Sequence, residues 1–490
     1  MQAFGRRRIM DQGETPLVRA LENHRLKNKA AFHIPAHRQG QALPVELLGA
    51  RQHIFAYDLT EVDGLDDLHN PKGAIARAQQ LAAQAFGAEK SYFLVNGSSS
   101  GLQALILATC QGEDLVILPR NVHRSVLTGL IYSGARPVYI YPSLVDKFGI
   151  PAPITGQELN KCLQEHPKAK AVLTVHPNYY GVAGRLEELV KTAHGFDIPL
   201  MVDEAHGGHF PFHRDLPPDG LSCGADAVVQ STHKVAGALT QASMLHLKSD
   251  KIEPARVEDC LRMVQSTSPS YILMASLDAA RRQMATQGEQ MLEQSLQLAR
   301  QLRDKINELP HCEVLSSSHF KDKGSVFIDK TRLVINVQAL GLTGFEVKDI
   351  LSASYGVQVE LADHCNVVAI MGLKACKDDG RRLYEALKDM DKYKSSSRKG
   401  GKPLQPPPAQ VISSPRRAWM GKSKSIELEK SAGKISADSV AVYPPGIPAL
   451  CPGELISKDM VEYLVEVRSR KLHIQGSGDT SLRSIRVLDL

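Results

Sequence analysis

The chain has 490 residues, of which 43% are hydrophobic and 23% charged, a composition typical of a globular protein with more than one domain. Its formal net charge of +6 is small, and much of it lies in one late segment, so it does not indicate a nucleic-acid partner. The sequence has no apolar run of the roughly 18 residues that a membrane span needs, and residues 1–16 lack the apolar core of a secretory signal.

In chain order, residues 1–45 resemble an N-terminal arm with one helical stretch and then a loop containing Pro35 and Gly40. Residues 46–310 alternate short β-rich runs with helical stretches such as 102–110 and 185–195. The runs that predict buried strands are 91–95, 114–119, 137–141, 171–176, 199–206 and 227–234. The alternation predicts an α/β major domain whose mostly parallel sheet is covered on both faces.

A long helical pattern over 274–309 closes this region and is expected to link it to a smaller α+β domain at 311–490. Strands are expected at 332–340, 357–363 and 367–372, with a helix between the first two. Ser, Gly, Pro and Lys dominate 392–417, which predicts a disordered insertion over about 392–425.

The eight cysteines are spread along the chain and form no CxxC pair, which argues against a zinc site and against a disulfide framework. We therefore expect no metal and a reducing compartment, the cytoplasm or an organelle such as a plastid.

Polar residues with side chains that can bind ligands or take part in catalysis follow four of the predicted strands: NGSSSG (96–101), RNVHRS (120–125), DEAHGGH (203–209) and STHK (231–234). Because ligands bind beyond the carboxyl ends of parallel strands, these segments are predicted to meet at one edge of the sheet. Their convergence is a site hypothesis in its own right.

Two of these segments suit a phosphorylated cofactor. The glycines and hydroxyls of NGSSSG, followed by a helix, suit a phosphate, although a Ser-rich helix cap would give the same pattern. Lys234 leaves a buried strand and could carry a carbonyl group as a Schiff base, although most lysines are simply solvated.

Asp203 ends a buried strand, so its carboxylate needs a cation such as a protonated pyridine nitrogen, unless it caps the next element. His206, three residues later, could orient that carboxylate. His123 could stack on a ring, or be an ordinary surface or core histidine.

The segment VQSTHKVAGALTQAS (229–243) resembles the lysine-attachment motif of the Orn/Lys/Arg decarboxylase family of fold-type I enzymes, which depend on pyridoxal 5'-phosphate (PLP). Further stretches resemble the same family in the same order: FHIPAHRQG, DLTEVDGLDDLHNPKGAIARAQ, NGSSSG, PRNVHRS, HPNYYGVAG, DEAHGGH and YPPGIPALCPGE. Together they cover nearly the whole chain apart from 392–425. The resemblance implies a fold-type I major domain and a short form of the family, without an N-terminal wing domain.

The resemblance also implies roles. Lys234 would carry PLP, Asp203 with His206 beside it would pair with the pyridinium nitrogen, and His123 would stack on the ring. Ser98, Ser99 and Ser231 would bind the phosphate, with His233 near it and near the substrate. Glu454 would lie near the distal amine of a cationic substrate, which an anion suits.

Three motifs depart from the family pattern: HIPAHRQG replaces a TPGHKGG-like sequence, HNPKG replaces HxPEG, and NGSSSG lacks the usual threonine. The first two could alter the substrate entrance or a dimer contact.

The implied reaction is decarboxylation of lysine, arginine or ornithine, giving cadaverine, agmatine or putrescine and CO₂. His233 and Lys234 are both candidates for protonating the α-carbon. Two alternatives stay open: another fold-type I enzyme such as an aminotransferase, for which the motifs offer no clear carboxylate-binding arginine, and an inactive regulatory homologue. The resemblance implies a homodimer or higher homo-oligomer. The small net charge and the lack of a long apolar run predict neither a nucleic acid nor a membrane as partner.

Overall fold

A seven-stranded sheet forms the centre of the largest domain in the computed structural model, with the strand order β1-β10-β9-β8-β6-β2-β3. The strands are β1 (Lys90–Leu94), β2 (Leu115–Pro119), β3 (Arg136–Ile140), β6 (Ala171–Val175), β8 (Leu200–Asp203), β9 (Ala227–Gln230) and β10 (Ser243–Leu247). Five of them, from β9 to β3, run parallel to one another. The six predicted strands are confirmed, and so is the mostly parallel α/β architecture.

The unpredicted strand β10 is antiparallel to both of its neighbours, β9 and β1. Two reversals restore the original direction, so β1 points the same way as the five parallel strands. The carboxyl ends of β1, β2, β8 and β9 therefore lie at one edge of the sheet.

Helices cover both faces of this sheet. One apolar cluster joins the strands to α3 (Gly97–Thr109), α4 (Arg124–Ser133) and α8 (Pro254–Val264). The other cluster joins them to α1 (Pro16–Leu26), α2 (Ala74–Phe86), α5 (Gly156–Glu165), α6 (Leu186–Gly195) and the first turns of α9 (Tyr271–Asn307). Strands enclosed in this way are apolar on both faces, which explains the continuous hydrophobic runs.

The structure describes residues 10–27, 31, 33–41, 43, 47, 54–145, 147–321, 324–394, 404–443 and 447–489. Part of the predicted arm, including residues 1–9 and Phe32, lies outside these ranges, as do residues 444–446 of the PPGIP turn. Among the described residues, no helix is both long and apolar enough to cross a bilayer.

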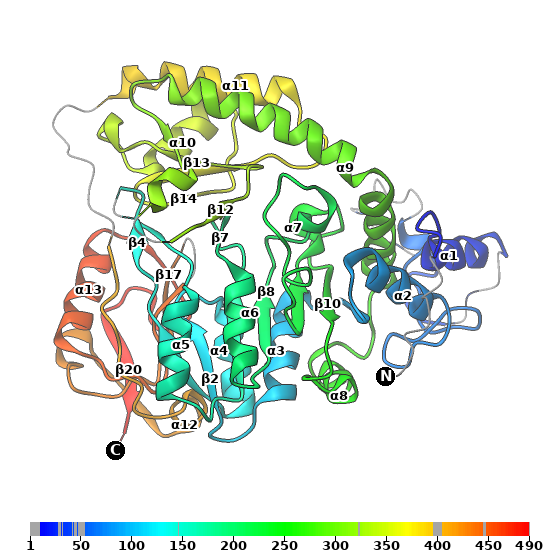
Figure 1. Cartoon of the computed structure of the whole chain (residues 1–490), viewed down its shortest axis with the longest axis horizontal. Helices are drawn as coiled ribbons and strands as arrows, with labels where there is room; N and C mark the ends of the chain where they lie inside the picture. Colours follow the sequence, from blue (N-terminus) through cyan, green and yellow to red (C-terminus); the bar gives the residue numbers. More distant parts are fainter. Residues whose placement is uncertain are drawn as a thin grey trace.

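The predicted linker helix is α9, which runs from the α1–α2 region to a second unit (Figure 1). That unit has a four-stranded antiparallel sheet in the order β11-β13-β15-β14. Its elements are β11 (Glu313–Val314), β13 (Arg332–Asn336), α10 (Gly344–Tyr355), β14 (Leu361–Ala362), β15 (Asn366–Ile370) and α11 (Lys377–Lys388). Two short strand pairs lie between the two units, β4 (Leu144–Val145) with β5 (Ile150–Pro151) and β7 (Val182–Ala183) with β12 (Phe327–Ile328).

Residues 404–489 form a third unit with its own apolar core. Its elements are α12 (Pro415–Met420), β16 (Ser423–Glu427), β17 (Val440–Tyr443), β18 (Ile447–Leu450), α13 (Lys458–Ser469), β19 (His473–Gln475) and β20 (Ser484–Leu488). The predicted single domain at 311–490 is thus two units.

The predicted disorder over 392–425 is wrong for residues 404–425. Leu404 and Ala409 pack against the core of the third unit, Ala418 on α12 is fully buried, and β16 pairs along its length with β20. The prediction from composition was wrong because tertiary contacts order this Pro- and Ser-rich segment. Such contacts cannot be inferred from composition. Residues 395–403 lie outside the described ranges.

Candidate functional site

Ser98, His123, Asp203 and Lys234 each lie at or just beyond the carboxyl end of a different strand of the main sheet, β1, β2, β8 and β9. Electrostatic interactions link three of them, because the charges of His123 and Lys234 both act on the pKa of Asp203. The structure therefore places the predicted constellation at one edge of the sheet.

Ser98 and Ser231 form a cradle of two hydroxyl groups that could hold an anion. The two hydroxyl oxygens are 2.9 Å apart, although their residues are 133 positions apart in the chain. Ser98 and Ser99 lie in the first turn of α3, where Asn96 makes no side-chain capping bond, so the first amides of that helix are available to an anion. The hydroxyl of neighbouring Thr232 is buried with no hydrogen-bond partner among the described residues.

Asp203 is a buried carboxylate for which the described residues provide no ion pair in direct contact. Its side chain accepts a hydrogen bond from the backbone N–H of Ala205 at 3.1 Å. Burial raises its pKa, while the nearby charges of His123 and Lys234 lower it. A cation placed against this carboxylate would offset the burial.

Lys234 lies in the short helix α7 (Thr232–Val235), directly after β9. Its Nζ is 3.1 Å from Nε2 of His206. The side chain is open to solvent on one side, while protein atoms surround it elsewhere. This desolvation, together with the charge of Arg332, lowers its pKa, and the carboxylates of Asp203 and Glu360 act the other way.

His206 does not orient Asp203, contrary to the sequence prediction. Its Nε2 faces Lys234, and its Nδ1 accepts a hydrogen bond from Nη2 of Arg332 at 2.8 Å. Both ring nitrogens are thus engaged, which leaves none for the carboxylate. Burial, followed by the charges of Arg332 and Lys234, holds the pKa of His206 well below its ordinary value.

The other two histidines of the site are positioned by local bonds. Nδ1 of His233 donates to the carbonyl of Ala242 at 3.0 Å, so in the neutral ring Nε2 carries a free lone pair. His123 is solvent-accessible and caps α4, with its Nδ1 accepting from the backbone N–H of Ser125 at 3.2 Å. Desolvation lowers the pKa of both rings.

Glu454, which was predicted to lie near the substrate, pairs with Arg120 instead. It is buried and forms a two-bond ion pair with Arg120, whose Nη2 lies 3.0 Å from Oε2. The same oxygen accepts the backbone N–H of Cys451 at 2.8 Å. With both oxygens occupied inside the fold, Glu454 offers no free carboxylate to a ligand near Lys234.

Three residues of the site were not predicted: Tyr179, Arg332 and Glu360. The ring of Tyr179 lies 4.6 Å from that of His206, and its hydroxyl donates to Oε1 of Glu360 at 2.9 Å. Glu360 is exposed and acts electrostatically on Lys234. Two signals could have found them: the paired tyrosines of HPNYYG, and an arginine directly before the apolar run LVI (333–335).

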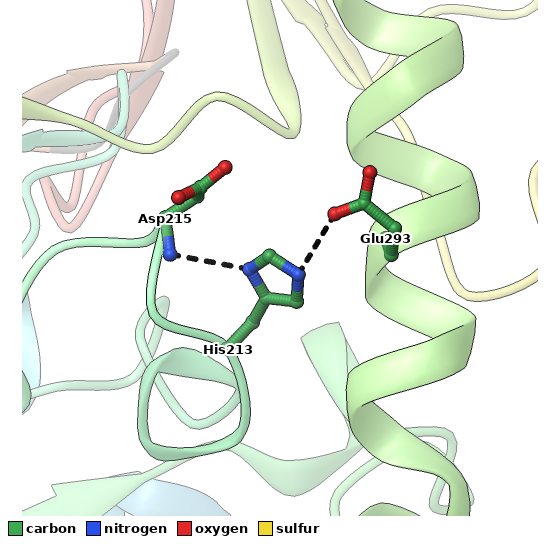
Figure 2. A group of neighbouring side chains, drawn as sticks. All are labelled: His213, Asp215 and Glu293. Atoms are coloured by element: carbon green, nitrogen blue, oxygen red, sulfur yellow. Dashed lines mark hydrogen bonds and ion pairs between the residues drawn. The ribbon is translucent and has the colours of Figure 1, made fainter.

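The loop after β8 is also fixed to α9. Figure 2 shows His213 between Asp215 and Glu293, with Nε2 3.1 Å from Oε2 of Glu293 and Nδ1 accepting the backbone N–H of Asp215 at 3.2 Å. These side chains offer three ligand atoms within 4.8 Å of one another. Both nitrogens of the imidazole are already used, so the group acts as a structural link between this loop and α9.

Comparison with known proteins identifies the family. The model of the Orn/Lys/Arg decarboxylase major domain matches residues 15–379, and the model of its C-terminal domain matches residues 406–477. The chain belongs to the Orn/Lys/Arg decarboxylase family. The resemblance inferred from the motifs is thereby confirmed, together with the prediction of an amino acid decarboxylase.

Several proteins are similar over the whole chain. An arginine decarboxylase from Bacillus subtilis is 39% identical over 98% of this chain and 99% of its own length, and one from Bacillus anthracis is 39% identical over 98% of both. The constitutive lysine decarboxylase of Escherichia coli shares the fold, with a TM-score of 0.84 at 21% identity, covering 98% of this chain and 82% of that one. An alanine–glyoxylate aminotransferase from Nostoc is more distant, with a TM-score of 0.52 at 17% identity, covering 65% of this chain and 86% of that one.

Proposed function

We propose that the protein is a PLP-dependent decarboxylase that converts arginine to agmatine and CO₂. The observation that carries this proposal is the meeting, at one sheet edge, of an anion cradle, an incompletely paired buried carboxylate and a lysine amine with a lowered pKa. Arginine is preferred over lysine and ornithine because the relatives at 39% identity are named arginine decarboxylases.

The residues present fit PLP. Ser98, Ser99, Ser231 and the first amides of α3 would hold the phosphate. Asp203 would pair with the protonated ring nitrogen, which would place a cation in direct contact with this buried carboxylate. Lys234 would attach the cofactor covalently, and His123 would lie against the ring. Bound there, PLP supplies an electron sink for the electron pair released when the carboxylate leaves.

The chain's own groups would control the proton that replaces CO₂ on the α-carbon. Two atoms can deliver it, Nε2 of His233, whose lone pair is free to take up a proton, and Nζ of Lys234. The ring of Tyr179 lies 4.6 Å from that of His206, whose Nε2 faces the lysine.

Glu360 is the carboxylate that we assign to the cationic end of the substrate. It is exposed, lies close enough to Lys234 to act on its pKa, and is oriented by the hydroxyl of Tyr179. A carboxylate can bind a planar guanidinium through two hydrogen bonds, which an ammonium group cannot match.

An aminotransferase is the competing enzyme class, and the structure supplies the arginine that the motifs lacked. However, Arg332 is buried, and its guanidinium already donates to Asp329, Tyr179 and His206. It cannot also bind a substrate carboxylate without breaking that network. An inactive regulatory homologue is disfavoured because Lys234 and Asp203 are both present.

The test incubates the purified protein and PLP with arginine, lysine or ornithine and identifies the amine and CO₂ formed. Agmatine without any added keto acid is the expected product, with Lys234→Ala as the inactive control. A turnover that requires 2-oxoglutarate would identify an aminotransferase, and no amine from any of the three substrates would refute the decarboxylase proposal.

We also propose that the protein acts as a homodimer in the cytoplasm. Large apolar side chains are exposed on the arm (Leu26 and Ile34), in the segment that follows Lys234 (Leu239) and on α8 (Met263), as expected of surfaces that a second copy covers. All eight cysteines are free, which suits a reducing compartment. Sedimentation analysis would test the dimer, and Ile34→Glu should weaken it.

A further inference from the structure

The hydrogen bonds around His206 allow only one arrangement of protons. Arg332 is always charged and has only donors, so Nδ1 of His206 must be the acceptor in their 2.8 Å contact. The single proton of the neutral imidazole is then on Nε2, which points at Nζ of Lys234 at 3.1 Å. To accept that proton, the amine must have a free lone pair. A protonated Lys234 would place N–H against N–H at Nε2.

Arg332 is held rigidly enough to impose this arrangement. Its side chain is fully buried, with Nε 3.3 Å from Asp329 and Nη1 donating to the carbonyl of Tyr179 at 2.7 Å. Asp329 also accepts from the hydroxyl of Thr331 at 2.6 Å. Gly181 leaves the space that the guanidinium chain occupies, because a Cβ there would meet Cδ of Arg332 at 2.7 Å.

The other charged groups around the amine do not impose the neutral form by themselves. Asp203 and Glu360 favour a protonated amine, whereas the charge of Arg332 disfavours it. Two more histidines, His123 and His233, lie near His206 and add positive charge around it when they are protonated. A directed hydrogen bond from His206 is therefore a distinct contribution, which selects one protonation state of Lys234.

We propose that Arg332 is a positioning residue that acts through His206: it fixes the tautomer whose Nε2–H donates to Lys234, and so holds the lysine amine neutral and nucleophilic. This deepens the proposed function and rests on it, because a neutral amine is the form that attaches to an aldehyde cofactor. Arg332 itself touches neither the cofactor nor the substrate in this assignment.

The experiment measures the protonation of Lys234 directly, without cofactor or turnover. The full-length protein, freed of bound aldehyde with hydroxylamine, is labelled with trace acetic anhydride across a pH series, and mass spectrometry gives the extent of acetylation of each lysine. In the wild type, Lys234 should become reactive at a pH at least one unit below that of exposed lysines such as Lys348 in the same sample.

The contacts from Arg332 through His206 to Lys234 form a hydrogen-bond relay. The variant Arg332→Lys separates the effect of this relay from the effect of a positive charge alone. The variant keeps a cation near Asp329, but one ammonium group cannot reach Asp329, Tyr179 and His206 together. The relay predicts that the reactivity midpoint of Lys234 rises by about one pH unit, which is about tenfold less labelling at a fixed lower pH. An unchanged midpoint in a folded Arg332→Lys protein overturns the proposal.

Two further comparisons serve as controls. Arg303→Lys is the matched control: Arg303 donates to the carbonyl of Arg332 at 2.9 Å without joining the relay, so the midpoint should not move. In a His206→Leu background, Arg332→Lys should have no further effect, since the relay is already broken. A full shift in that background would mean that Arg332 acts through space. Because wild-type CO₂ release is assayed separately, a failure of the relay is distinguishable from a failure of the decarboxylase proposal.

Discussion

Arg120 and Glu454 form a buried two-bond ion pair that fastens the third unit to the carboxyl end of β2. Arg120 directly follows that strand, and it also donates to the carbonyl of Ala449 at 2.9 Å and lies 4.5 Å from the ring of Tyr139. The acidic group after the PPGIP turn thus serves to dock one unit on another.

Removing one partner of this pair should destabilise the fold rather than weaken substrate binding. Glu454→Gln leaves the Arg120 guanidinium buried without its counter-ion, which costs about 3–5 kcal/mol. We expect the free energy of unfolding in urea to fall by that order, while the KM for arginine of the folded fraction stays near the wild-type value.

The double variant Arg120→Met/Glu454→Leu is the control for this prediction. It removes both charges, so it should recover much of the stability lost in Glu454→Gln. A large rise in KM for Glu454→Gln at unchanged stability would instead restore the substrate role predicted from the sequence.

Gly181 should not tolerate a side chain, because a Cβ would clash with Arg332. A second glycine with a positive φ, Gly64, separates this clash from backbone strain. The φ of Gly181 is +80°, and a Cβ there would lie 2.7 Å from Cδ of Arg332. Gly64 has a φ of +90°, and no described residue has an atom within 4 Å of a Cβ placed there. Gly64→Ala should therefore cost only the backbone strain, about 1 kcal/mol.

Gly181→Ala should cost about 1–3 kcal/mol more, because Arg332 must move in a packed environment. It should also shift the acetylation midpoint of Lys234 upward, as Arg332→Lys does, whereas Gly64→Ala leaves it unchanged. Equal losses of thermal stability in the two alanine variants would contradict the steric argument.

The sequence predicted the parts of the site that local patterns mark. Asp203 and Lys234 stand where apolar runs stop, and strands that end at one edge bring such residues together. Arg332 escaped prediction because its contact with His206 joins residues 126 positions apart in two different units. The role of Glu454 was misjudged for the same reason, since its partner Arg120 is 334 positions away.

The ordered structure of residues 404–425 could not be predicted, because composition indicates only whether a segment would fold in isolation. The hydroxyl of Tyr141, on the main domain, donates to the carbonyl of Ala409 and accepts its N–H, each at 3.0 Å. Such contacts satisfy the backbone of a Pro-rich stretch without any regular element.

The Ser98–Ser231 cradle should contribute to cofactor affinity. Each hydroxyl could donate a charge-assisted hydrogen bond to a phosphate, worth about 1.5–3 kcal/mol, so Ser98→Ala and Ser231→Ala should each raise the Kd for PLP roughly tenfold or more. Ser100→Ala is the control on the same helix, because its hydroxyl donates to the carbonyl of Gly97. Equilibrium dialysis measures the effect, and equal Kd values for all three variants would exclude the cradle as the phosphate site.

Buried histidines should make the protein sensitive to acid independently of catalysis. His176 is enclosed at the end of β6, and its Nε2–H donates to the carbonyl of Pro218 at 2.9 Å. Burial lowers its pKa to about 4, so between about pH 6.5 and pH 4 the unfolded chain binds a proton that the folded chain does not. The free energy of unfolding must then fall as the pH falls through that window, by up to about 3 kcal/mol for this residue. His176→Gln keeps an N–H donor but cannot titrate, so urea unfolding at pH 7 and pH 5 should show a smaller loss of stability for the variant than for the wild type. If the two proteins lose the same stability, His176 does not set the acid limit of the fold.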